Sequence, residues 1–105
     1  AEQRAAYDER LATIDKQQPG DPPATVEDFV NHIDYAVKLL GIDHVGIASD
    51  FDGGGGLTGW NDASETFNVT LELARRGYDE GQIEKLWGSN LLRVMDEVQR
   101  RAGTL

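Results

Sequence analysis

The chain has 105 residues, a length that suits one small domain rather than two. Its 19 acidic residues against 10 basic ones give a net charge of −9, which disfavours nucleic acid or an anionic membrane surface as a partner. The chain has no cysteine, which excludes disulfides and thiolate chemistry, and no apolar run of the length that would predict a transmembrane segment.

Residues 1–18 are predicted to form a weak helix. Apolar side chains recur there at spacings of four and three, which places them on one face: Tyr7, Leu11 and Ile14. The segment PGDPP then ends the helix, because each proline fixes φ and removes a backbone donor. Residues 19–24 are therefore predicted to be a linker.

Residues 25–40 are predicted to form the clearest helix of the chain. Thr25 can cap its first turn while Asp28 answers three residues later, which is the pattern of a capping box. The apolar side chains of this segment share one face: Val26, Phe29, Val30, Ile33, Val37 and Leu40. Gly41 stands where a left-handed residue commonly ends a helix.

One segment, 44–49, is predicted to be a strand. From Val45 to Ser49 the residues are small or β-branched on both faces, which is typical of a strand covered on both sides. A lone strand leaves backbone N–H and C=O groups unpaired on both edges, and such groups rarely stay unpaired when buried. We therefore expect this strand to pair with a segment outside the sequence or with a second copy, as in a homodimer, and we expect the chain to be the C-terminal part of a larger α/β protein.

Residues 62–102 are predicted to form a series of closing helices. The first begins at a second capping-box pattern, Asp62 with Glu65, and ends before Gly77. A short helix follows and is predicted to close at Gly88. The last helix carries apolar side chains on one face: Leu92, Met95 and Val98.

The loop 50–61, which begins DFDGGGG, allows four interpretations. Acids and glycines are typical of a simple turn. Asp50 and Asp52 fit the first and third positions of a calcium loop, but position five is Gly54 and position twelve is Asn61 rather than a bidentate Glu. A dinucleotide fingerprint fits the glycine spacing, but two carboxylates would repel a pyrophosphate. The fourth is an active-site acid at the C-terminal end of a barrel strand, where side chains converge on the reaction centre.

The motif IDHVGIASDFDGG, followed further along the chain by WGSNLLRVM, resembles the C-terminal end of the membrane (renal) dipeptidase family. That family consists of zinc metallopeptidases with an amidohydrolase-type barrel. The resemblance covers residues 25–98 and concerns the C-terminal part only. It implies a TIM-type β/α barrel in which 44–49 is the last strand and 50–61 the active-site loop, and a chain that is mostly helical when taken alone.

The resemblance also implies a function for the full-length protein, which is hydrolysis of dipeptides with two zinc ions. It implies that Asp50 is the general base that takes a proton from the zinc-bridging water. Asp52 and Gly53 would then bind substrate or shape the loop. The place of Asp52 inside the turn predicts that its carboxylate bonds to nearby backbone N–H groups. The family's zinc ligands lie on earlier strands, so we expect no metal ligand in this chain and no activity from it alone. The expected partners are a dipeptide and the N-terminal remainder of the barrel.

A second class of function stays open on the residues themselves. The chain could be a non-enzymatic helical interaction or regulatory module with a glycine-rich loop, which a stable monomer with a paired strand would favour. His32 and His44 are predicted to be structural. Trp60 fits either a pocket wall or simple packing, and Asn90 is predicted to cap backbone groups.

Overall fold

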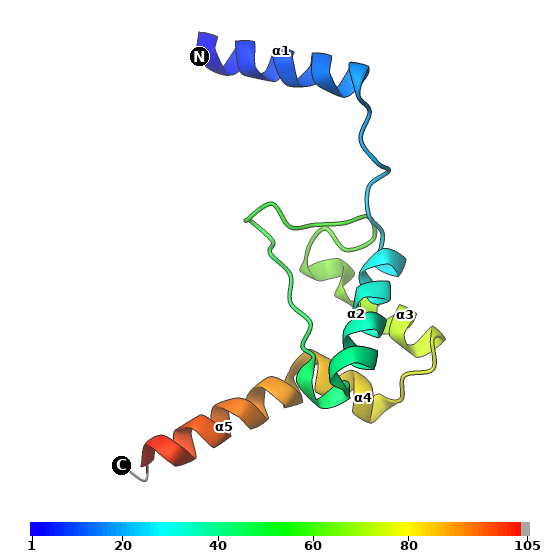
Figure 1. Ribbon diagram of the computed structural model, residues 1–105, viewed down its shortest axis with the longest axis vertical. Helices are drawn as coiled ribbons and strands as arrows, with labels where there is room; N and C mark the ends of the chain where they lie inside the picture. Colours follow the sequence, from blue (N-terminus) through cyan, green and yellow to red (C-terminus); the bar gives the residue numbers. More distant parts are fainter. Residues whose placement is uncertain (104–105) are drawn as a thin grey trace.

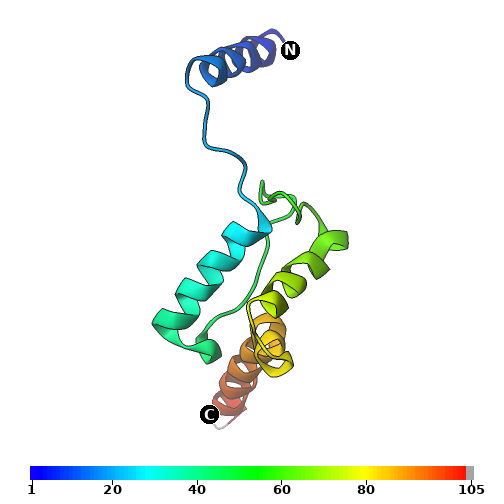
Figure 2. The same ribbon diagram turned by 90° about the vertical axis from the view of Figure 1, so that its right-hand side faces the viewer.

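A computed structural model of the chain describes residues 1–103, and these are mostly helical, as predicted. The elements in chain order are α1 (Glu2–Gln17), α2 (Val26–Leu40), η1 (Ile42–His44), η2 (Ala63–Glu65), α3 (Thr66–Arg75), α4 (Glu80–Glu84), η3 (Lys85–Ser89) and α5 (Asn90–Gly103). Helices α2, α3 and α4 gather into one group, from which α5 projects, while α1 stands apart (Figures 1 and 2).

The N-terminal helix and the linker occur where they were predicted. Helix α1 contains no buried residue, in agreement with the weak apolar pattern of 1–18. Residues 19–24 carry no helix and connect α1 to the rest of the chain as an extended segment (Figure 1). The linker therefore holds α1 away from the core rather than folding it back.

The predicted capping box of α2 is confirmed. The backbone N–H of Asp28 donates to Thr25 Oγ1 at 3.3 Å, and the backbone N–H of Thr25 donates to Asp28 Oδ2 at 2.9 Å. The bond from the Thr25 backbone, followed by the bond from its side chain, lowers the pKa of the Asp28 carboxyl. At the other end Gly41 has a φ of +91°, a conformation that favours glycine. Both ends of α2 thus follow from local sequence.

The strand predicted over 44–49 is not formed in the described residues. His44 belongs to η1, and Val45 then begins an extended segment (φ −121°, ψ 135°) that runs back along α2 without a ladder partner (Figure 1). The physical reason is that pairing needs a neighbouring strand, and residues 1–103 offer none. The backbone N–H of Ile47 donates instead to the carbonyl of Leu86 at 2.9 Å.

The second capping box, predicted for Asp62 and Glu65, is wrong in its partners. Asp62 Oδ1 accepts from the backbone N–H of Ser64 at 2.8 Å, and Glu65 Oε2 accepts from the backbone N–H of Asn61 at 2.7 Å. The bond two residues ahead forms an Asx-turn, which is tighter than a capping box and suits the 3₁₀ geometry of η2. Helix α3 consequently begins at Thr66.

Gly88 does not close a helix, contrary to the prediction. The chain passes from α4 through the π-helical segment η3 directly into α5, and Gly88 does not have a positive φ. A π-helical turn leaves a carbonyl without an α-helical partner. The carbonyl of Leu86, which lies within this turn, accepts from the backbone N–H of Ile47 and so links the turn to the extended segment.

A polar cluster ties α2 to the end of α3. The guanidinium of Arg76 pairs with Asp34 at 2.7 Å and with Glu72 at 3.0 Å, and the Tyr78 hydroxyl donates to Asp34 at 2.6 Å. Burial raises the pKa of the Asp34 carboxyl, but the hydrogen bonds from Tyr78 and Arg76 lower it below its ordinary value of 3.8. Burial, together with Asp34, raises the pKa of Tyr78 to about 12.

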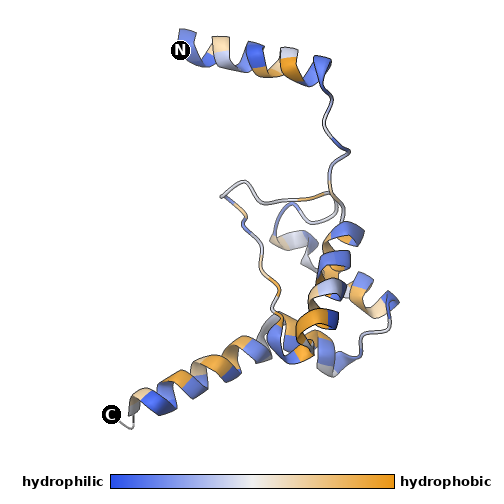
Figure 3. Ribbon diagram, in the orientation of Figure 1, coloured by the Kyte–Doolittle hydropathy of each residue, from blue (hydrophilic) through white to orange (hydrophobic). Residues whose placement is uncertain are grey.

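The core is small and lies between α2, α3, η3 and the extended segment. Its buried apolar residues are Val30, Ile33, Val45, Trp60, Val69, Leu73 and Leu86. Helix α5 contributes none of them, although apolar residues recur along it (Figure 3). Its exposed apolar side chains are Leu91, Leu92, Val94, Met95 and Val98. No helix among residues 1–103 is both long and apolar enough to span a bilayer.

Candidate active site

Asp50 lies at the end of the extended segment, where the sequence predicted an active-site acid. The chain turns immediately after it, and the backbone carbonyl of Asp50 accepts from the N–H groups of Gly53 at 3.1 Å and Gly55 at 2.8 Å. Within this turn Asp52 has a φ of +68°, the one positive φ of a non-glycine residue in 1–103. Aspartate tolerates that conformation better than most residues, so Asp52 shapes the turn through its backbone.

The glycines after Asp50 differ in what they make possible. A Cβ added to Gly53 would lie 2.5 Å from Asp50 Oδ2, so Gly53 leaves the space in which the Asp50 carboxylate sits. A Cβ added to Gly55 would lie 2.7 Å from the carbonyl oxygen of Asp50 and 2.8 Å from its Cβ. Sequence reasoning missed Gly55, because nothing within a run of four glycines marks the one that touches a backbone.

Both acids of the turn are solvent exposed. Within the described residues the carboxylates of Asp50 and Asp52 accept no hydrogen bond and form no ion pair, so the expected bonds from Asp52 to nearby backbone N–H groups are not formed. The lone pairs of Asp50 therefore stay available to an incoming molecule. A proton acceptor needs such free lone pairs, whereas a carboxylate that caps a helix already accepts hydrogen bonds from backbone N–H groups.

Asp50 borders a cavity of about 200 Å³. Its lining is formed by Phe29, Ala48, Ser49, Asp50, Phe51, Gly55, Gly56, Leu57 and Trp60. Trp60 is buried, and the rings of Phe29 and Phe51 meet it edge-on with centroids 5.1 and 5.5 Å away. Both interpretations of Trp60 hold, because it packs in the core and also forms a wall of the cavity.

Asn90 anchors the start of the extended segment. Its side-chain amide donates to the carbonyls of Ile42 at 2.7 Å and Val45 at 2.9 Å, which confirms the prediction that it caps backbone groups. Asn90 is buried, and Arg93 donates to its amide oxygen while also bonding to the carbonyl of Asp43. The segment that leads to Asp50 is thus held by side chains that come 45 or more residues later.

No metal site is formed by the part of the chain that the structure describes. No three histidine, cysteine or acidic side chains come together there. His32 lies on α2 with Nδ1 3.0 Å from the carbonyl of Asp28, and His44 ends η1 at the far end of the extended segment from Asp50. These residues do not fit a zinc centre, which normally needs three or four convergent ligands.

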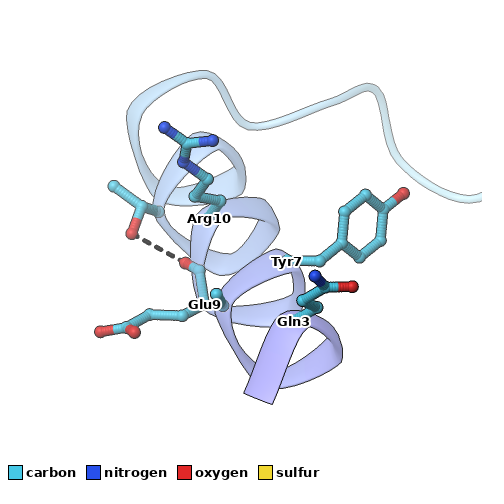
Figure 4. A pocket seen from close by; sticks show the side chains of 6 residues that line it. Gln3, Tyr7, Glu9 and Arg10 are labelled. Carbon is cyan, nitrogen blue, oxygen red and sulfur yellow. Dashed lines mark hydrogen bonds between the residues drawn. The ribbon is translucent and has the colours of Figure 1, made fainter. Parts of the chain in front are cut away.

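A second hollow, of about 560 Å³, lies along α1 (Figure 4). Its lining comes from this one helix, and side chains such as Tyr7 and Glu9 point away from each other in Figure 4. A hollow lined by a single isolated helix has no opposing wall. The cavity beside Asp50, which is lined from several segments, is therefore the better candidate site.

Comparison with known proteins gives a consistent result. Residues 6–105 match the membrane dipeptidase family (Peptidase family M19). The chain is 45% identical over 80 residues to the dipeptidase ataJ of Aspergillus terreus, which covers 75% of this chain and 20% of that protein. It is 39% identical over 77 residues to the dipeptidase tcpJ of Claviceps purpurea, which covers 72% of this chain and 18% of that protein.

A solved structure is similar as well. The crystal structure of the probable dipeptidase PvdM from Pseudomonas aeruginosa superposes with a TM-score of 0.77 and 51% sequence identity, over 96% of this chain and 25% of that chain. The chain spans about a fifth of the length of the curated relatives that it matches, and a quarter of the length of the solved structure.

Proposed function

We infer the function from one premise: this chain belongs to the membrane dipeptidase family, peptidase family M19. The resemblance that the motifs indicated is thereby confirmed. We propose that the full-length protein hydrolyses dipeptides. We further propose that this chain is the C-terminal portion of its TIM-type β/α barrel, with 44–49 as the last strand.

The uncovered surface of the chain supports the barrel proposal. Its accessible surface is 8267 Å², whereas a compact monomer of this mass exposes about 5,800 Å². Among the backbone groups of residues 46–49, only the N–H of Ile47 has a hydrogen-bond partner in the described structure, and the apolar side chains of α5 are exposed. A neighbouring strand and its helices would satisfy both, and the dipeptidases are four to five times longer than the matched region.

Asp50 is proposed as the general base of the reaction. The observation that carries this is the exposed Asp50 residue, whose carboxylate has no partner in the described structure and which lines a cavity. In peptide hydrolysis a base takes a proton from the attacking water and delivers it to the leaving amine. Asp52 and Gly53 are proposed to shape the loop around this carboxylate rather than to exchange protons.

Two zinc ions form part of the proposal for the full-length protein, but their ligands lie outside this chain. The described residues bring no three metal-binding side chains together. We therefore assign the residues of this chain no role in holding zinc. Asp50 is proposed only to accept and pass on a proton.

The experiment that tests this is Asp50→Asn in the full-length enzyme. The amide keeps the size of the side chain but lacks the basic oxygen that takes the proton. We expect kcat to fall about 100-fold or more, which is roughly 3 kcal/mol of barrier, with zinc content unchanged. Steady-state kinetics on a dipeptide and metal analysis of the same preparation provide the measurement.

Asp52→Asn is the matched control. Asparagine adopts the left-handed conformation of position 52 as readily as aspartate, and the Asp52 carboxylate makes no bond within the described residues. We expect kcat within about threefold of the unchanged enzyme and a similar melting temperature. Near-normal kcat in Asp50→Asn, or an emptied zinc site, would disprove the assignment of Asp50 as the base.

A further inference from the structure

The cavity beside Asp50 is lined mostly by apolar side chains. Large ones come from helix α2, the turn and the loop that follows it: Phe29, Phe51, Leu57 and Trp60. Asp50 is the one charged residue in the lining. Pockets that recognise small molecules commonly combine apolar walls with a few well-placed polar groups, and here Ser49 and Asp50 are the polar residues of the lining.

The aromatic walls of the cavity are fixed by contacts with residues outside its lining. The indole N–H of Trp60 donates to Thr66 Oγ1 at 3.1 Å, and a second indole, Trp87, meets it edge-on at 6.0 Å. Phe29 and Phe51 pack on the same ring. A wall fixed in this way keeps its shape when a ligand binds, so the cavity can discriminate by size.

The proposed reaction places a substrate side chain near this cavity. A general base must lie within hydrogen-bond reach of the water that attacks the scissile carbonyl, about 2.6–3.2 Å. In a dipeptide that carbonyl carbon is bonded directly to the Cα of the amino-terminal residue. The side chain of that residue begins one bond from the scissile carbonyl carbon, so it lies within several ångströms of the Asp50 carboxylate that activates the water.

We propose that the cavity receives the apolar side chain of the amino-terminal residue of the dipeptide. This rests on the proposed function and narrows the substrate class to dipeptides that begin with a residue such as leucine or phenylalanine. A cavity of about 150 Å³ is known to admit benzene, so about 200 Å³ accommodates either side chain. Ala48, the smallest side chain on the extended segment that lines the cavity, leaves that volume open.

The test fills the cavity with Ala48→Leu in the full-length enzyme. The measurement is kcat/KM for leucyl-alanine and phenylalanyl-alanine against glycyl-alanine, with alanyl-leucine and alanyl-phenylalanine as the reversed pair. We expect kcat/KM to fall at least tenfold for leucyl-alanine and phenylalanyl-alanine. It should change less than threefold for glycyl-alanine, alanyl-leucine and alanyl-phenylalanine. Ala74→Leu, on the exposed face of α3, makes the same change away from the cavity and is expected to leave all five values unaltered.

A second variant, Leu57→Ala, enlarges the cavity and decides the question if Ala48→Leu does not fold. We expect it to raise the kcat/KM of tryptophyl-alanine relative to alanyl-alanine by at least fivefold. An equal loss of kcat/KM on every dipeptide overturns the proposal, and so does a change that depends on the carboxy-terminal residue. Unchanged selectivity overturns it too, because another segment of the full-length protein then fills the cavity. Failure of the unchanged enzyme to hydrolyse any dipeptide overturns the proposed function and this proposal together.

Discussion

At the scale of single residues, the turn after Asp50 depends on glycine for two different reasons. At position 53 the atoms nearest to an added side chain belong to the Asp50 carboxylate, which is the free end of a flexible side chain. At position 55 a side chain would meet the backbone of Asp50, which cannot move without moving the turn. A substitution at position 53 therefore tests where the Asp50 carboxylate is placed, whereas a substitution at position 55 tests how the loop folds.

We predict that Gly53→Ala and Gly55→Ala in the full-length protein, assayed as the proposed dipeptidase, behave differently. Gly53→Ala should lower kcat about tenfold with little change in melting temperature, because only the carboxylate is displaced. Gly55→Ala should lower kcat and also cost about 1–3 kcal/mol of stability, because it overpacks the backbone. Kinetics and thermal unfolding of both variants provide the measurement.

Gly20→Ala serves as the control for these two variants. Gly20 lies in the linker with no atom within 4 Å of an added Cβ and without a positive φ, so the substitution should change neither quantity. If Gly55→Ala keeps both full activity and full stability, the contact between Gly55 and the Asp50 backbone does not organise the turn.

At the scale of elements, the contact between α2 and α3 includes a charged cluster that titrates. The side chains of Arg76 and Asp34 are 21% and 26% exposed, so solvent screens their interaction only in part. The pKa of Asp34 in the folded state lies below its ordinary value. Its contribution to stability is therefore present above about pH 4 and is lost as the pH falls through the folded pKa.

We predict that Asp34→Asn lowers the stability of the full-length protein by about 1 kcal/mol at pH 7, since asparagine can still accept one of the two hydrogen bonds. The difference between the two proteins should shrink below about pH 4, because protonation of Asp34 removes the same charge. Chemical denaturation at pH 7, 5 and 3 provides the measurement.

Tyr78 adds a second pH window to this cluster. Its pKa is raised to about 12, so its contribution to stability is present below about pH 10 and is lost as the pH rises towards 12.

Asp96→Asn, on the exposed side of α5, is the control for Asp34→Asn and should leave stability unchanged. A deficit of Asp34→Asn that is the same at pH 3 and pH 7 would show that the charge of Asp34 does not stabilise the fold.

At the scale of the whole molecule, the chain is expanded for its length. Its radius of gyration is 19.1 Å, whereas a compact domain of this length has about 13 Å. Part of this expansion comes from α1, which buries no residue, and part from α5, whose apolar side chains are open to solvent. An exposed apolar surface of this extent is normally buried against another part of the protein or against a partner.

We therefore predict that residues 1–105, expressed alone, do not melt as a cooperative monomer. The chain should associate with copies of itself or show fluctuating packing, because the extended segment and α5 lack partners. Thermal unfolding followed by circular dichroism at several protein concentrations, with sedimentation analysis, provides the measurement. A cooperative melt of a monomer that does not depend on concentration would contradict the proposal that this chain is part of a larger barrel.

The sequence by itself determined the elements whose signals are local. The capping box of Thr25 and Asp28, the break at the prolines of the linker and the positive φ of Gly41 all depend on neighbouring residues, so the pattern was sufficient. The family followed from motifs, because IDHVGIASDFDGG and WGSNLLRVM occur together in one order. The position of Asp50 at the end of an extended segment was also predictable, since a change from apolar to acidic residues marks it.

Only the tertiary structure decided what depends on contacts between distant residues. Gly88 is typical of a helix end, but the chain continues through a π-helical turn into α5, and the carbonyl of Leu86 in that turn bonds to the distant Ile47. A strand was predicted over 44–49, yet a strand exists only through its neighbour, and the described residues contain none. The need for glycine at position 55 also depends on the folded turn. A Cβ there would clash with the backbone of Asp50, which lies next to Gly55 only when the turn is formed.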